Sequence, residues 1–384
     1  MDFLAFFAGI LVGFLGGLLP GLHSNTLVSV LSGLSIDPIF LSIMIVSLYP
    51  SHLIASYVPS IFFGIPDRSS ATLIMPGQRL VLEGKGLLAL KTALFSGSVA
   101  GIISLSFFYF STTFFSEIYP AIKAFVAYFL VFFSIILLLR TKNPLLSMLF
   151  FLTSGILCKY SLDLSVTDPF LPLFCGMFSA SSILTYEKGV DIPKQKEVEF
   201  DRTILPFVFL GAFAGLFSDL LPAIGSSSQI ATFISIFIPL NGLEYLATTS
   251  ALSISQFIFS LSSSAAINKS RIGATAVLSE ISNINENFVL YLPLIALAIV
   301  VSSAFVYLIR NKIAKLAQTD FSLAGKILLL YLIFLIFVFD GFFGLLVLAL
   351  STILGILLIK CGVERINLMG SIIVPTILLL FRIF

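Results

Sequence analysis

The chain has 384 residues, of which 58% are hydrophobic and 10% are charged, and its formal net charge is +2. A soluble domain carries about 25% charged residues, so this composition excludes an ordinary soluble globular protein. The three Cys and two His have no metal-binding spacing, and no basic patch interleaved with aromatic residues points to nucleic acid. We therefore predict an all-α polytopic membrane protein that lies in a lipid bilayer and has no cofactor and no metal site.

Apolar stretches long enough to cross a bilayer recur along the whole chain, since about 20 residues suffice for one crossing. The first stretch, 3–19, lacks a small-residue cleavage site, so we interpret it as a retained span rather than a signal peptide. The stretches after Pro20 and Pro222 are short and Ser-rich, which is typical of broken or re-entrant helices. The clearest predicted spans are 92–113, 122–140, 145–159, 169–185, 289–310, 325–339, 341–360 and 366–383.

The chain contains an internal repeat on either side of a polar stretch that begins at residue 186. The motif Gly9-x-x-x-Gly13, followed by Leu-Leu-Pro, recurs 202 residues later as Gly211-x-x-x-Gly215, again followed by Leu-Leu-Pro. Several polar gaps between apolar stretches recur at about the same offset. We therefore predict a first transmembrane repeat over 1–185, a cytoplasmic linker over 186–203 and a second transmembrane repeat over 204–384.

Positively charged loops predict the orientation, because short cytoplasmic loops are enriched in Lys and Arg. Five such clusters can all face the cytoplasm if each repeat has about seven membrane segments, an odd number. Both termini then lie outside and the two repeats are inverted, an architecture common among secondary transporters. Lys269 and Arg271 would lie outside, against the rule.

The Leu-Pro segments of the two repeats are the first candidate sites. Pro removes a backbone donor and frees a carbonyl, and a helix that restarts after such a break presents free amides that suit an anion. Two such breaks in corresponding positions indicate a substrate site, although each could instead be a kink whose hydroxyls bond to their own helix. The predicted substrate-binding residues here are Gly21, His23, Ser24, Asn25, Thr26, Gly225, Ser226, Ser227 and Ser228.

A second pair of polar breaks spans 64–72 and 262–271. Their Ser69, Ser70 and Asn268 are further predicted substrate-binding residues, and Arg68, Lys269 and Arg271 could attract an anion. The alternative is an ordinary charged loop at the membrane edge.

Asp219 lies three residues before Pro222 within an apolar stretch. An ionisable group inside a membrane is costly and is a functional candidate, so Asp219 could hold a coupling ion. The alternative is a salt bridge, or a position closer to the interface.

Five short motifs carry a resemblance to a known family: Leu19-Pro20-Gly21-Leu22, Ile65-Pro66, Gly77, Gly84-Lys85-Gly86 and Ala89-Leu90. They resemble the large permease subunit of the tripartite tricarboxylate transporter family. The resemblance is clear over roughly 5–105 and weaker over 205–280, and beyond these regions only hydropathy agrees. It implies carboxylate uptake driven by an ion gradient, together with a small membrane subunit and an extracytoplasmic binding protein.

The chain departs from the family pattern at several motif positions. His23 and Asp67 stand where the family has Gly, Pro76 replaces an acid, and Ala223 replaces a motif Gly. A divergent member could therefore have a different substrate, or work without the family's two partner subunits.

We interpret the chain as a secondary active transporter of the cell membrane, not an enzyme. It would move a small organic anion, with a carboxylate as the expected class, by alternating access coupled to a Na⁺ or H⁺ gradient. A homodimer is compatible with this interpretation. The alternatives are a membrane-embedded enzyme or lipid-handling protein, for which only His23 is placed to serve as a base, and a subunit that only scaffolds partners.

Overall fold

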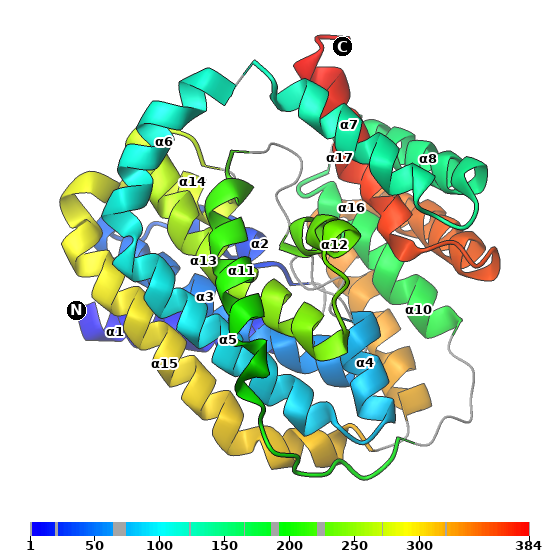
Figure 1. Ribbon diagram of the computed structural model, residues 1–384, viewed down its shortest axis with the longest axis horizontal. Coiled ribbons are helices and arrows are strands. Elements are labelled where there is room, and N and C mark those ends of the chain that lie inside the picture. Colours follow the sequence, from blue (N-terminus) through cyan, green and yellow to red (C-terminus); the bar gives the residue numbers. More distant parts are fainter. Residues whose placement is uncertain are drawn as a thin grey trace.

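The computed structural model describes residues 2–19, 22–63, 74–122, 124–164, 166–185, 192–220, 227–270, 272–318 and 321–383. All regular secondary structure in these ranges is helical, which confirms the predicted all-α class (Figure 1). The first part of the chain forms α1 (Asp2–Leu18), α2 (Ser24–Ser32), α3 (Pro38–Phe62), α4 (Ile74–Leu82), α5 (Gly86–Ser106), α6 (Phe108–Ile122), α7 (Val126–Leu139), α8 (Pro144–Asp163), α9 (Phe170–Phe174), the π-helical turn η1 (Cys175–Ala180) and α10 (Ser181–Leu184). The second part forms η2 (Arg202–Ile204), α11 (Leu205–Ser218), α12 (Ser227–Phe237), α13 (Gly242–Ile267), α14 (Gly273–Ile281), α15 (Ile284–Leu316), α16 (Phe321–Lys360), η3 (Arg365–Met369) and α17 (Gly370–Leu380).

Two long helices, α3 and α13, form the centre of the larger of two bundles. Each has an apolar window that is more than four-fifths buried inside the protein. α1 packs against α3 and α11 packs against α13. A Cβ on Gly13 of α1 would overlap the carbonyl oxygen of Leu48, and one on Gly211 of α11 would overlap that of Thr248. The Gly-x-x-x-Gly motifs therefore allow close helix contact, as small residues commonly do in membranes.

The two sequence halves interlock within this bundle. α3 packs against α15 from the second half, and α13 packs against α5 from the first half. Tyr57 of α3 donates a hydrogen bond of 3.2 Å to the carbonyl of Ser250 in α13, so the two central helices are also bonded to each other.

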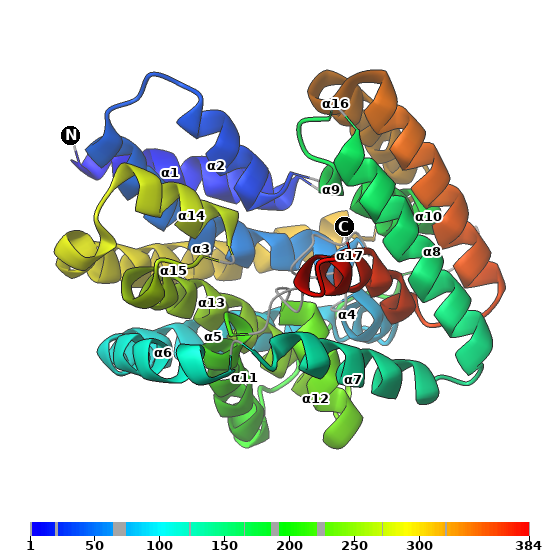
Figure 2. The ribbon, with the colours of Figure 1, turned by 90° about the horizontal axis from the view of Figure 1, so that it is seen from above.

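A smaller bundle consists of α8, α9, η1, α10, α16 and α17, packed around residues such as Phe151, Met177 and Leu354. α8, α10 and α16 lie on the right in both Figure 1 and Figure 2, whereas α1 and α15 of the larger bundle lie on the left.

Helix α16 folds back on itself at Gly341, whose backbone angles are φ 63° and ψ −152°. A Cβ on Gly325 would lie 3.3 Å from Ile183, and one on Gly355 would lie 2.7 Å from Ser181. In a straight helix two residues 30 positions apart would be separated by about 45 Å. Because both contact the short α10, the two arms of α16 run antiparallel. This agrees with the two separate spans, 325–339 and 341–360, that the sequence predicts.

Several helices match predicted spans, and others are too short to cross a membrane alone. Among the described residues, six helices are long and apolar enough to span, or seven if α6 and α7 are taken as one bent span. α2 has 9 residues and α12 has 11, in agreement with the broken segments expected after Pro20 and Pro222.

The linker packs on one face of the larger bundle. Its Gln195 is buried, accepts a hydrogen bond of 2.7 Å from the amide of Gly86 and donates one of 2.9 Å to the carbonyl of Val81. Glu197 forms ion pairs with Lys91 of α5 and Arg310 of α15. The linker is therefore bonded to both halves.

Candidate functional site

The start of α2 is the best-described part of the candidate site. His23 caps the helix, because its Nδ1 accepts a hydrogen bond of 3.0 Å from the amide of Asn25. The His23 ring lies 6.3 Å from that of His52 in α3, centroid to centroid. Ser24 is 1% exposed, and its hydroxyl has no hydrogen-bond partner among the described residues. A buried hydroxyl at a helix start can bind an anion, since the first helical amides also lack intrahelical partners.

Asn25 joins α2 to α14 of the second half. Its side-chain oxygen accepts a hydrogen bond of 3.1 Å from the amide of Ala274, at the start of α14. A Cβ on Gly273 would lie 3.0 Å from the Asn25 side chain, so glycine permits this close approach. Two short helices from different halves thus begin at the same place.

Thr26 joins α2 to the smaller bundle. Its hydroxyl donates a hydrogen bond of 2.9 Å to Oδ2 of Asp168, which precedes α9. The amide of Asp168 donates one of 2.9 Å to Oδ1 of Asp340, at the turn of α16. Thr167 also donates to the carbonyl of Phe339. The predicted residues Ser24, Asn25 and Thr26 are therefore clustered with two acidic residues that the prediction did not include.

The second Leu-Pro segment is described only in part. Gly21, Gly225 and Ser226 lie outside the described residues, as does the side chain of Ser228. Ser227 begins α12, and its hydroxyl accepts a hydrogen bond of 2.8 Å from Ser253 of α13. It is therefore placed at a buried helix start, as Ser24 is.

Asp219 follows α11 and is 2% exposed. Its side chain is therefore buried inside the protein. Any role in ion coupling stays a prediction.

The polar break predicted at 262–271 begins later in the structure than expected. Ser262 to Ser264 are helical and buried within α13, so the break begins at Asn268, whose φ is 50°. The expected start at 262 was wrong because α13 continues to Ile267, and the Ser262 hydroxyl bonds back to the carbonyl of Phe259 within this helix. Arg68, Ser69, Ser70 and Arg271 lie outside the described residues.

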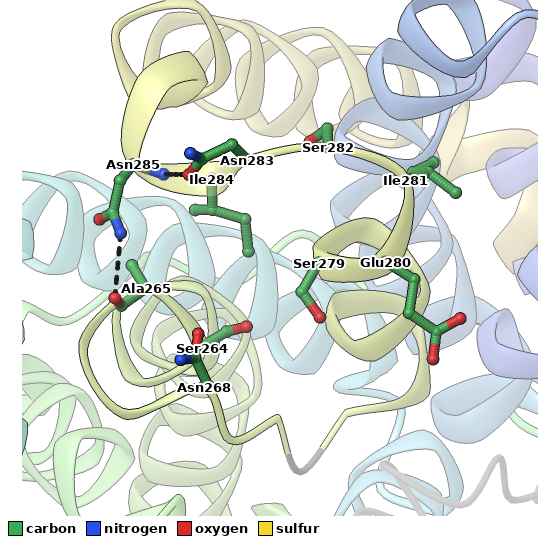
Figure 3. A pocket seen from close by; sticks show the side chains of 10 residues that line it. All are labelled: Ser264, Ala265, Asn268, Ser279, Glu280, Ile281, Ser282, Asn283, Ile284 and Asn285. Atoms are coloured by element: carbon green, nitrogen blue, oxygen red, sulfur yellow. Dashed lines mark hydrogen bonds between the residues drawn. The ribbon is translucent and has the colours of Figure 1, made fainter.

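Asn268 lines an open groove of about 530 Å³ between the end of α13 and the start of α15 (Figure 3). The groove is mostly polar, and Asn285 on its far side donates a hydrogen bond of 3.1 Å to Ala265. Lys269 points elsewhere: its ammonium donates a hydrogen bond of 2.6 Å to Tyr119 and lies 4.8 Å from the centre of that ring. Asn268 and Lys269 are thus adjacent in the chain but have different neighbours.

Comparison with known proteins agrees with the helical architecture and the motifs. The model of the tripartite tricarboxylate transporter TctA family matches residues 3–370. The chain belongs to this family. An uncharacterized protein of Methanocaldococcus jannaschii is 26% identical over 413 aligned positions that cover all of both chains. No solved structure matches the chain.

Family membership settles the broad class of the protein. The chain is a multi-pass membrane protein and a permease of a transporter family, which implies that it is not an enzyme. The TctA family supplies the permease of a tripartite system, which implies a small membrane subunit and a binding protein as partners. The resemblance noted over 5–105 and 205–280 thus extends over nearly the whole chain.

Proposed function

We propose that the protein is a secondary active transporter that moves a small organic anion, of the carboxylate class, across the cell membrane by alternating access coupled to a Na⁺ or H⁺ gradient. The observation that carries this proposal is the start of α2, where the Ser24 hydroxyl is buried and has no hydrogen-bond partner among the described residues. Free helical amides and a hydroxyl donor are the groups that bind a carboxylate in a dry site.

The proposed site extends to the other predicted residues. The two helix starts would be completed by Gly21, His23, Asn25, Thr26, Gly225, Ser226, Ser227 and Ser228. Ser69, Ser70 and Asn268 would also bind the substrate. Asp219 would take part in ion coupling, and the anion would be attracted by Arg68, Lys269 and Arg271. Support comes from the short helices α2 and α12, each of which begins at or near a Leu-Pro segment. Discontinuous helices of this kind coordinate substrates in many transporters.

The proposal includes two inverted repeats, 1–185 and 204–384, joined by a cytoplasmic linker at 186–203, with both termini outside. The matching glycine contacts of α1 with α3 and of α11 with α13 support the repeat. The reciprocal packing of α3 with α15 and of α13 with α5 supports it as well. Moving the larger bundle against the smaller one would supply alternating access.

Transport is tested with purified protein in liposomes, with citrate and succinate as the carboxylates and an inward Na⁺ or H⁺ gradient. We expect uptake only when a gradient is present. Ser24→Ala should lower the apparent affinity for the carboxylate about 10- to 100-fold, because a hydrogen bond to a charged group is worth roughly 1.5–3 kcal/mol. The matched control is Ser29→Ala, an exposed serine of the same helix. Equal loss in both variants would contradict the site, and no gradient-dependent flux of any carboxylate would contradict the function.

A further inference from the structure

Asp340 is a buried carboxylate with an unsatisfied oxygen. It is 5% exposed, and its Oδ2 has no hydrogen-bond partner among the described residues. Its Oδ1 accepts the amide hydrogen of Asp168 at 2.9 Å. None of the ion pairs formed among the described residues involves either acid. Because burying a charged carboxylate is costly unless a positive charge compensates it, a bound cation or a proton would stabilise this oxygen.

The backbone around Asp340 favours a cation. Asp340 ends the first arm of α16, and the turn at Gly341 interrupts the helix directly after it. The last carbonyls of a helix lack intrahelical donors, and the helix dipole makes this end negative. Carbonyls at such half-helix ends coordinate Na⁺ in transporters.

A second carboxylate and a hydroxyl complete the cluster. Asp168 accepts hydrogen bonds from Thr26 through Oδ2 and from the amide of Phe170 through Oδ1. The Thr26 oxygen, which donates its hydrogen to Asp168, still has lone pairs to offer a metal ion. The hydrogen bond between Asp168 and Asp340 brings these groups to one place, where two carboxylates, a hydroxyl and helix carbonyls would offer only oxygen ligands, which suit a hard cation.

We propose that Asp340 and Asp168 bind a Na⁺ ion, with Thr26 as a further ligand, and that this ion permits an anion to bind at the start of α2. The second part of the proposal rests on the proposed function. Thr26 is the third residue of α2, and without the cation the charge of Asp168 beside it would repel an anion at that helix start. A bound Na⁺ removes this repulsion, so the binding of each ion raises the affinity of the protein for the other.

Sodium binding is tested without any carboxylate, by thermal unfolding of the purified full-length protein in detergent. Samples contain 1–300 mM NaCl, with choline chloride added to keep the ionic strength constant. We expect NaCl to raise the Tm of the wild type in a saturable way, by about 2–4 °C. Asp340→Asn keeps the size of the side chain but should abolish this rise. Asp163→Asn, an exposed acid at the end of α8, is the matched control and should keep it.

Several results would overturn the sodium site: no response of the wild type to NaCl, an equal response in Asp340→Asn, or an equal response to KCl. A Tm that follows pH and ignores Na⁺ would identify a proton and would likewise overturn it. Should Asp340→Asn fail to fold, Thr26→Val is tested instead, with a rise in the Na⁺ concentration for half-maximal effect as the expected result. A sodium response without transport of any carboxylate would leave this site standing while the proposed function failed.

Discussion

Thr26 donates a hydrogen bond to Asp168 across 142 positions of the chain, and this bond joins α2 to the loop before α9. α2 packs with the larger bundle and α9 with the smaller one. A relative motion of the bundles must therefore break this bond or carry α2 along with α9. Contacts of this kind are where a transporter can couple ligand binding to movement.

The first prediction concerns the strength of this bond. Thr26→Val removes the donor at nearly constant shape, and Asp168→Asn removes the charge of the acceptor. We expect each change to lower the free energy of unfolding by about 1–2 kcal/mol, and the two effects to be non-additive by about 1 kcal/mol. Thermal unfolding of the four proteins in a double-mutant cycle measures this coupling. Strict additivity would show that the bond contributes nothing in solution.

The second prediction concerns the close contact between α1 and α3. Gly13→Ala places a Cβ against the backbone carbonyl of Leu48, which cannot move aside as a side chain could. The helices must separate, so we expect a loss of about 1–3 kcal/mol or more in the free energy of unfolding. Gly33→Ala is the control, because its Cβ would lie 3.5 Å from the nearest atom, the carbonyl oxygen of Val30. A small effect of Gly13→Ala on the Tm would contradict this packing.

The parts of the site that could be predicted are those with a local signal. A Leu-Pro segment followed by Ser24, Asn25 and Thr26 indicates a broken helix and a polar restart, and the structure has a helix that begins at Ser24. The fold class follows in the same way from the length and composition of the apolar stretches.

The acidic cluster could not be predicted because its members meet only in three dimensions. Asp168 and Asp340 are 172 positions apart, and both lie at boundaries of predicted spans, where an acid is expected to be solvated. Burial of Asp340 depends on how α16 folds back against α9 and η1. The burial of Gln195 could not be predicted for a similar reason, because nothing in the sequence of a polar linker indicates which side chain turns inward.

The third prediction uses the pH dependence of the linker contact. The hydrogen bond from Lys91, helped by Arg310, holds the pKa of Glu197 below its ordinary range. A lowered pKa in the folded state means that the ion pairs stabilise the protein near neutral pH. This stabilisation is fully present above the ordinary pKa of a glutamate and is lost as the pH falls below it and through the lowered pKa. The Glu197 side chain is 45% exposed, so solvent screening limits the effect to below about 1 kcal/mol.

Glu197→Gln should therefore lower the Tm slightly at pH 7 in low salt. The difference from the wild type should shrink in high salt and vanish at low pH. Lys194→Gln, which changes an exposed charge in the same linker, should not show this dependence. A Tm difference for Glu197→Gln that is independent of both pH and salt would mean that the carboxylate acts through packing and not through charge.

The last prediction concerns the turn of α16. Gly341 has a φ of 63° and a ψ of −152°, a combination that is essentially restricted to glycine, although no atom lies within 4 Å of its hypothetical Cβ. Gly341→Ala should therefore cost about 1–3 kcal/mol through backbone strain alone. Gly362 has a φ of 66° and equally open surroundings, and it caps the end of the same helix in a left-handed conformation. Alanine in such a cap lowers the free energy of unfolding by about 1 kcal/mol.

Because Gly341 positions Asp340, Gly341→Ala should also weaken the response of the Tm to NaCl, whereas Gly362→Ala should leave that response unchanged. Equal sodium responses in the two variants would show that the turn does not shape the cation site.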